Sequence, residues 1–395
     1  MKQSYLKKQN DPNVGIRCFL IAIYIVLSFF EYYTLMAFGS ITKYYIFLVI
    51  VMILLTSNHL RIHYYHYTIV GWLAYKFLSL IWTPNYAVFG MHAISEVGFV
   101  LLLVGITSLE ESEATLKVLQ YSSWICSFVL GVLSLFFSRA YEGEQNRQVL
   151  SLFGRQLDPN NVAAFLLFGI AISLYAILYE KKHKVLHLVI VITNSYATLM
   201  TGSRAGLLAI AVIILVFVVT LYNPDSFKRS YNRILLIAVI ILAAGIIIFN
   251  FLPEDISNRL FVFEDYEGGS NRDVMWQHGL NILANPIYLL MGIGWGGYRA
   301  DGGYLSLHNT FLSILCDTGI FGFALLFVPI FLLLRKMLKE KNVLPFAVFI
   351  ASMVPSFFIE AVNKRFFWNA IIYVLVAYNC SLKKQPVEEE QNTNK

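Results

Sequence analysis

Apolar stretches recur along this chain from end to end, and most span roughly 17–25 residues, long enough to cross ~30 Å of hydrocarbon. Charged residues make up 14% of the 395 positions, whereas a soluble protein of this length carries about 25%. Hydrophobic residues reach 58%. These features predict an all-α fold, namely a polytopic integral membrane protein with about twelve transmembrane helices.

We expect residues 1–382 to form a single membrane domain and residues 383–395 to form a charged cytoplasmic tail. The N-terminus resembles a secretory signal, but no small-x-small cleavage pattern follows it, so we interpret it as a retained first helix. The seventh and eighth spans are short and also fit one bent element interrupted at TGSRAG (201–206). The expected spans are about 16–38, 43–57, 66–82, 88–108, 119–138, 161–179, 185–201, 205–221, 233–251, 318–335, 344–361 and 366–382.

The distribution of positive charge predicts the orientation. With both termini placed in the cytoplasm, 19 of the 30 Lys and Arg residues fall on inner segments, as the positive-inside rule requires. The inner set contains 14 Lys and 5 Arg, whereas the outer set contains 8 Arg and 2 Lys. Because the guanidinium group binds phosphate through two parallel hydrogen bonds, this outer excess of arginine suggests phosphate recognition. The alternative is that these arginines pair with outer carboxylates.

Two outer loops are much longer than connectors, at about 139–160 and 252–317. In the second loop, which lies between the ninth and tenth spans, Trp276, Leu280 and Leu283 have helical spacing. They predict an amphipathic helix on the outer interface. The glycine-rich stretch at 291–305 then predicts a flexible connector or lid.

A polar pair, His308 and Asn309, begins the otherwise apolar stretch LHNTFLSILCDTGIFG (307–322). His308, Phe311, Leu312 and Leu315 share one helical face, and the glycines that follow permit a bend into the tenth span. We therefore expect His308 to face a pocket at the outer boundary of the membrane. On residue type alone, an interfacial histidine bonded to a carbonyl group would be the commoner explanation.

Four short patterns, taken in order, resemble the O-antigen ligase and polymerase superfamily of bacterial envelope enzymes. His308 and Asn309 are followed after nine residues by Gly319 and then by Gly322. The other three patterns lie upstream and are TGSRAG (201–206), NRDVMWQHGLNILANP (271–286) and GRQLDPNNVAAF (154–165). The resemblance covers nearly the whole chain, and it also matches the large outer loop before the last three spans.

This resemblance implies glycosyl transfer on the outer face of the bacterial cytoplasmic membrane. The donor would be a glycan linked to undecaprenyl pyrophosphate, and an acceptor hydroxyl would displace the lipid pyrophosphate. His308 would act as base or orient the hydroxyl, and Asn309 would bond sugar or fix the turn. Preorganised cations would stabilise the leaving group, with Arg204 and Arg272 as the first candidates and Arg155 as the third.

Two enzymes of this superfamily fit the motifs equally. A polymerase extends lipid-linked repeat units of O-antigen, capsule or exopolysaccharide, and a ligase transfers the finished glycan to another acceptor such as lipid A-core. We favour the polymerase, because every bacterium that exports such units needs one. The expected partners are the glycan donor and acceptor, membrane lipid, a flippase and chain-length regulator proteins, with no nucleic acid.

A flippase or transporter is a less favoured alternative, because the notable polar groups lie outside and no half-to-half duplication is evident. A non-catalytic partner of an envelope complex would leave the outer arginines unexplained. We expect no metal site, no cofactor and no disulfide framework. Within the spans, Lys76 is expected to pair with Glu96, and Glu360 with Lys364 or Arg365.

Overall fold

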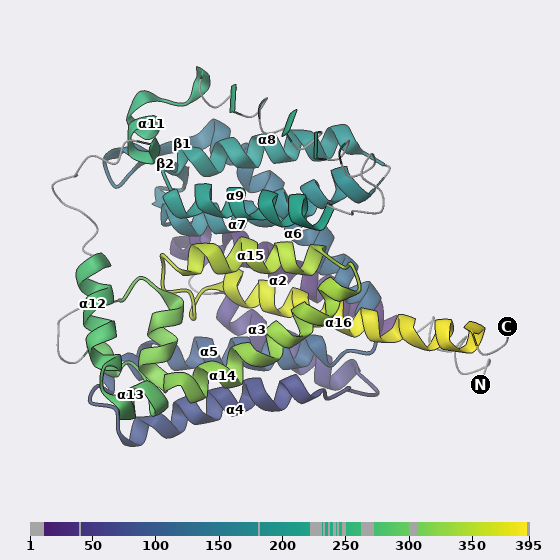
Figure 1. The fold of residues 1–395 in the computed structure, drawn as a ribbon, viewed down its shortest axis with the longest axis vertical. Coiled ribbons are helices and arrows are strands. Elements are labelled where there is room, and N and C mark those ends of the chain that lie inside the picture. The colour runs from purple at the N-terminus through teal and green to yellow at the C-terminus, as the bar shows by residue number, and fades with distance from the viewer. Residues whose placement is uncertain are drawn as a thin grey trace.

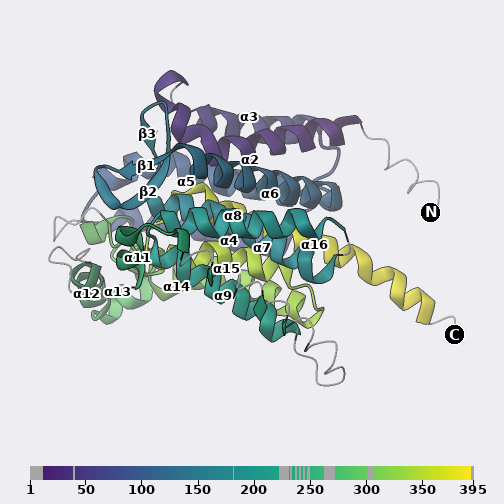
Figure 2. The same cartoon turned by 90° about the horizontal axis from the view of Figure 1, so that it is seen from above.

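The long helices lie side by side with their axes roughly aligned (Figures 1 and 2). The computed structural model describes residues 12–38, 41–180, 182–221, 250–261, 272–299 and 306–392, with scattered positions between 231 and 246. The start of the first described helix and the end of the last lie at one end of the bundle, and the short outer-loop elements gather at the opposite end. The described parts of the two predicted long loops, at about 139–160 and 252–317, therefore lie at the same end of the bundle.

Helices cover eleven of the twelve predicted spans, and the ninth span, about 233–251, lies largely outside the described residues. They are α2 (Pro12–Phe38), α3 (Ile41–Thr56), α4 (Tyr64–Leu78), α5 (Ala87–Thr107), α6 (Ser112–Phe137), α7 (Pro159–Tyr179), α8 (Lys184–Met200), α9 (Arg204–Leu221), α14 (Thr310–Lys339), α15 (Leu344–Ser356) and α16 (Arg365–Asn392). The helix α16 continues through most of the predicted tail.

Five of the described helices are long and apolar enough to cross a membrane, and four further apolar helices are shorter. The five are the 13–33 part of α2 together with α6, α7, α9 and α14. The predicted class, a helical membrane protein, is therefore supported, while the count of twelve spans stays a prediction.

The helices α7 and α16 form the centre of the bundle. Nearly every side chain of α7 is buried, and so is the run from Phe366 to Tyr378 of α16. A helix that is apolar on all sides is buried by its neighbours, and α7 packs against α6, α8, α9 and α15. Large side chains such as Trp72 and Trp368 fill the core beside it.

The first long loop forms a small antiparallel sheet, which the sequence did not predict, although the fold is mostly helical as expected. Its strands are β1 (Ser138–Tyr141), β2 (Glu144–Leu152) and β3 (Arg155–Gln156), in that order. Two-residue turns join them, and Glu142, Gly143, Phe153 and Gly154 all have positive φ. Such turns match the twist of paired strands and favour hairpins.

The second long loop contains α11 (Glu254–Phe261), α12 (Arg272–Leu283), α13 (Pro286–Met291) and the short 3₁₀ helix η4 (Gly297–Arg299). The helix α12 packs against α14, so it does not lie alone on the interface. Leu283 is buried there and Trp276 is half-buried, but Leu280 is exposed, so the predicted apolar face is correct only in part.

The glycine-rich segment between α13 and η4 is packed, so its prediction as a flexible connector or lid is wrong for residues 292–299. Trp295 is 1% exposed, and its backbone N–H donates to the Ser79 hydroxyl. The N–H of Ile293 donates to the Cys316 carbonyl group. Residues 300–305 lie outside the described part of the chain.

Lys76, Glu96 and Asp317 form a buried charge cluster that joins α4, α5 and α14. The Lys76 Nζ lies 2.7 Å from Glu96 Oε2 and 3.3 Å from Asp317 Oδ2. The predicted Lys76–Glu96 pair is thus confirmed, and the structure adds a second carboxylate. Asp317 also accepts the Gly296 N–H, which fixes the glycine-rich segment to the bundle.

Candidate active site

A cavity of about 430 Å³ contains His308 and several charged groups that are far apart in sequence. We call it the His308 cavity. Its walls come from β2, α5, the start of α7, α12, η4, the turn before α14 and the connection between α15 and α16. The lining residues are His92, Arg147, Asp158, Asn160, Asn161, Arg272, Arg299, Ser306, His308, Ile359, Glu360, Asn363 and Lys364.

His308 lies just before α14, so it does not share a helical face with Phe311 and Leu312 as expected. Its backbone is left-handed, with φ of 48°, and its N–H donates to the Ser306 hydroxyl. A non-glycine residue held at positive φ is often a sign of a functional constraint. Burial lowers the pKa of the imidazole, and the Arg272 charge lowers it further, against the opposing effect of Glu360 and Asp158.

Asn309 caps the helix that follows His308. Its side-chain oxygen accepts the Leu312 N–H at 3.1 Å, and its backbone is extended. This is the usual N-cap geometry, which satisfies one of the free donors at a helix start. Of the two roles expected for Asn309, the structure therefore supports fixing the turn.

The cations Arg272 and Arg147 both line the cavity. Arg272 begins α12, and Arg147 lies in β2, where its Nε donates to the Thr201 carbonyl group at 3.2 Å. Burial lowers the pKa of both groups, and each lies close enough to sense the charge of another arginine. Arginine nevertheless keeps its proton in proteins. Two half-buried like charges facing one space favour an anion between them.

Arg204 lies outside the His308 cavity, so the structure does not bring it together with His308 and Arg272. Its side chain is exposed, and its Nε donates to the Arg259 carbonyl group at 2.9 Å. Arg259 in turn donates to the Gly202 carbonyl group at 3.2 Å. The turn at TGSRAG therefore braces both Arg147 of β2 and Arg259 of α11.

Arg155 also lies outside the cavity, in β3. Its neighbour Asp158, which was noted with it in the sequence, does line the cavity and caps α7 by accepting the Asn160 and Asn161 N–H groups. Of the expected arginines, Arg204 and Arg272 first and Arg155 third, Arg272 lines the cavity with His308 and the other two do not. The second arginine that lines the cavity is Arg147. The sequence indicated it only through the general excess of arginine on the outer segments.

Glu360 is held by neighbours other than those expected. Its Oε1 accepts from Arg299 at 2.7 Å and from the Tyr298 hydroxyl at 2.8 Å, and its Oε2 accepts from Ser306 at 2.7 Å. Arg365, the predicted partner, pairs with Glu31. The Glu360 cluster therefore joins η4 to the turn that carries His308, and it leaves Lys364 without an ion pair among the described residues.

This arrangement combines a neutral imidazole with cations around an anion-sized space. A histidine with a pKa below its usual value near 6.5 is deprotonated at neutral pH and can accept a proton. Arg272, Arg147 and Lys364 can bind phosphate oxygens. In the described part of the chain, no group of three or more His, Cys, Asp or Glu residues is arranged to hold a metal ion.

Residues 189–327 match the family model described as O-antigen ligase. The matched range contains Arg204, Arg272 and His308, and it runs from α8 to the middle of α14. The predicted resemblance to the O-antigen ligase and polymerase superfamily is therefore confirmed. No curated protein matches the chain.

Proposed function

We propose that this protein is a membrane glycosyltransferase that polymerises oligosaccharide repeat units linked to undecaprenyl pyrophosphate. The observation that carries the proposal is that His308 and Arg272, both within the matched family range, line one cavity with Arg147 and Lys364. The cavity is formed largely by the outer-loop elements, which we assign to the outer face of the bacterial cytoplasmic membrane.

The donor pyrophosphate binds the cations in this mechanism. Arg272 and Arg147 contact phosphate oxygens, and Lys364, which lines the same cavity, adds a third positive charge. Half-buried cations in fixed positions stabilise the charge that grows on the leaving group as the glycosidic bond breaks. Arg204 acts at a distance from the donor. Its Nε holds the Arg259 carbonyl group of α11, and the Gly202 carbonyl group holds the Arg259 side chain.

His308 accepts the proton of the acceptor hydroxyl. The hydroxyl oxygen attacks the anomeric carbon of the donor sugar, the bond from that carbon to the pyrophosphate oxygen breaks, and undecaprenyl pyrophosphate leaves with the bonding electrons. The imidazole gains the proton that the hydroxyl loses. A base placed this way contributes ~10²–10⁴-fold to the rate.

A ligase is the second candidate, because the matched family model is described as O-antigen ligase. The same residues would then transfer a finished glycan to an acceptor such as lipid A-core. The two activities share the donor chemistry and differ in the acceptor. A flippase and chain-length regulators remain the partners we propose for the polymerase.

A deletion strain tests the proposal directly. Surface glycan from the strain is separated by size, and lipid-linked intermediates are extracted and sized in parallel. A single repeat unit without a ladder is the result we expect for a polymerase. A full ladder left on undecaprenyl pyrophosphate would identify a ligase, and repeat units trapped at the inner face would identify a flippase.

A further inference from the structure

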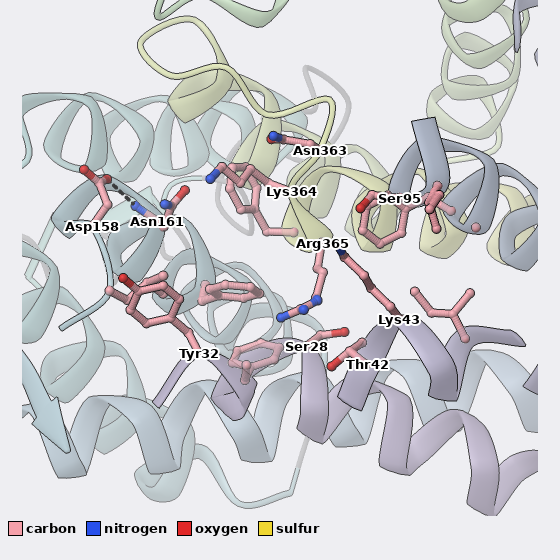
Figure 3. A pocket seen from close by; sticks show the side chains of 18 of the residues that line it. Ser28, Tyr32, Thr42, Lys43, Ser95, Asp158, Asn161, Asn363, Lys364 and Arg365 are labelled. Carbon is pink, nitrogen blue, oxygen red and sulfur yellow. Dashed lines mark hydrogen bonds between the residues drawn. The ribbon is translucent and has the colours of Figure 1, made fainter. Parts of the chain in front are cut away.

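A second cavity, of about 330 Å³, is drawn in Figure 3 and adjoins the His308 cavity through shared lining residues. We call it the α2–α5 cavity, because α2, α3 and α5 form its far wall and the start of α7 and residues 363–366 complete it. The two cavities share four lining residues, which are Asp158, Asn161, Asn363 and Lys364. A molecule in the α2–α5 cavity would therefore reach the residues that also surround His308.

The lining of the α2–α5 cavity suits a sugar. Aromatic side chains, among them Phe29, Phe99, Phe165 and Phe366, provide flat apolar surfaces. Ser28, Ser95 and Asn161 add polar groups to the same lining (Figure 3). A pocket with apolar walls and a few placed polar groups binds a ligand that has both kinds of surface, and a pyranose ring has apolar C–H faces and a hydroxyl edge.

Three polar atoms at this cavity lack a hydrogen-bond partner among the described residues. They are Thr42 Oγ1, Asn161 Oδ1 and Asn363 Oδ1. Thr42 is fully buried and Asn161 is 7% exposed, so water does not readily replace the missing partner. Because a buried polar atom without a partner costs about 1–3 kcal/mol, the wall of the cavity contains polar groups that the described residues leave unsatisfied.

The charge at this cavity is positive. Lys43 and Lys364 form no ion pair with any described residue, whereas Arg365 is paired with Glu31. Asp158 is the acid among the lining residues, and it already caps α7. Two free lysines on opposite walls favour a carboxylate or phosphate group on the ligand.

The prenyl tail of the donor is a poor occupant for this space. More than half of the lining residues carry polar side chains, and a tail lying here would remove water from Lys43, Lys364 and Asp158 without replacing it. Such desolvation of charged groups costs several kcal/mol. The observations therefore favour a glycan.

On the basis of the proposed function, we infer that the α2–α5 cavity is the acceptor site and that it selects an acidic saccharide. The acceptor glycan lies against the aromatic wall, with its acidic group near Lys43. Its reacting hydroxyl passes Asn161 and Asn363 into the His308 cavity. Lys43 is then a specificity-determining residue that has no contact with the donor.

Binding of saccharides to the purified full-length protein in nanodiscs tests this inference. The probes are the acidic hyaluronan tetrasaccharide, the neutral chitin tetrasaccharide and undecaprenyl pyrophosphate. We expect the acidic tetrasaccharide to bind more tightly, and Lys43→Gln to weaken its binding by about threefold to fivefold. The double variant Lys43→Gln/Lys364→Gln should weaken it further.

The controls separate this site from the donor site. Lys43→Gln should leave binding of undecaprenyl pyrophosphate unchanged, whereas Arg272→Gln should weaken it. Lys117→Gln removes an exposed charge on α6 and should change neither. Equal binding of the two tetrasaccharides, or loss of lipid binding in Lys43→Gln, would overturn the acceptor assignment. A wild-type protein that binds no undecaprenyl pyrophosphate would contradict the proposed function instead.

Discussion

His308 is fixed by its own backbone as much as by its surroundings. Its left-handed conformation is held between the Ser306 hydroxyl, which accepts its N–H, and the N-cap at Asn309. A residue other than glycine costs roughly 1–2 kcal/mol in the left-handed conformation, so the neighbouring contacts must offset that strain. The imidazole is thereby positioned before any substrate binds.

Substitution of His308 should stop synthesis with the fold intact. His308→Ala is expected to lower polymer formation ~10²–10⁴-fold, because the base is lost. The measurement is the length distribution of surface glycan, with protein level determined in the same membranes. His183→Ala is the matched control, since His183 is exposed and also has positive φ. A normal ladder in the His308 variant would exclude the proposed base.

The charge of Arg272 should set the acid limb of the pH profile. Because this charge lowers the pKa of His308, Arg272→Gln raises that pKa towards its usual value near 6.5. The imidazole then becomes protonated at a higher pH, so activity should fall earlier as the pH decreases. The measurement is kcat/KM against pH in proteoliposomes, with Arg139→Gln as the exposed control. An acid limb at the wild-type pH in Arg272→Gln would contradict the effect of the Arg272 charge on the pKa of His308.

At the scale of elements, turn residues decide how the outer loops fold. The dipeptides Glu142-Gly143 and Phe153-Gly154 occupy two-residue turns with positive φ, which turn the first long loop into a sheet. This sheet carries Arg147 to the His308 cavity. The glycines were visible in the sequence as a hairpin signal, but length alone led to a loop prediction.

Gly319 lets α14 bend where α13 ends. Its φ is 62°, and a Cβ at this position would lie 2.3 Å from the Leu290 carbonyl oxygen. With ψ of −171°, Gly319 lies in a backbone region that essentially only glycine adopts, so Gly319→Ala should lower the free energy of unfolding by at least ~1–3 kcal/mol, and the clash adds to this. Thermal unfolding in detergent measures the loss.

The control for this substitution is Gly71→Ala in α4. A Cβ there meets nothing within 4 Å, so the helix should gain about 0.5–1 kcal/mol. If Gly319→Ala melts at the wild-type temperature, the bend does not need a glycine.

At the scale of the whole molecule, the buried cluster of Lys76, Glu96 and Asp317 joins the neighbouring helices α4 and α5 to α14, which is far from them in sequence. Lys76→Met would leave two carboxylates buried without their cation and should cost ~3–5 kcal/mol. Heat stability of the purified protein measures the effect, and Lys117→Met is the exposed control. Lys76→Met/Glu96→Gln should recover part of the loss, because one buried charge is removed with its partner. No recovery would mean that Lys76 acts mainly through packing.

The sequence by itself determined the membrane class, the positions of most helices, the Lys76–Glu96 pair and the family resemblance. These follow from local properties, namely apolar length, charge and short motifs, which need no knowledge of neighbours. The sequence also led to the prediction that His308 and Arg272 belong to one site, and both residues lie within the matched range and line one cavity.

The tertiary structure alone decided which cations surround His308. Arg204 lies in the matched range but outside the cavity, whereas Arg147, Lys364 and Glu360 come from segments that no motif connects to His308. The physical reason is that helix packing and hairpin turns set the distances between remote side chains. Charge and spacing along the chain do not encode those distances.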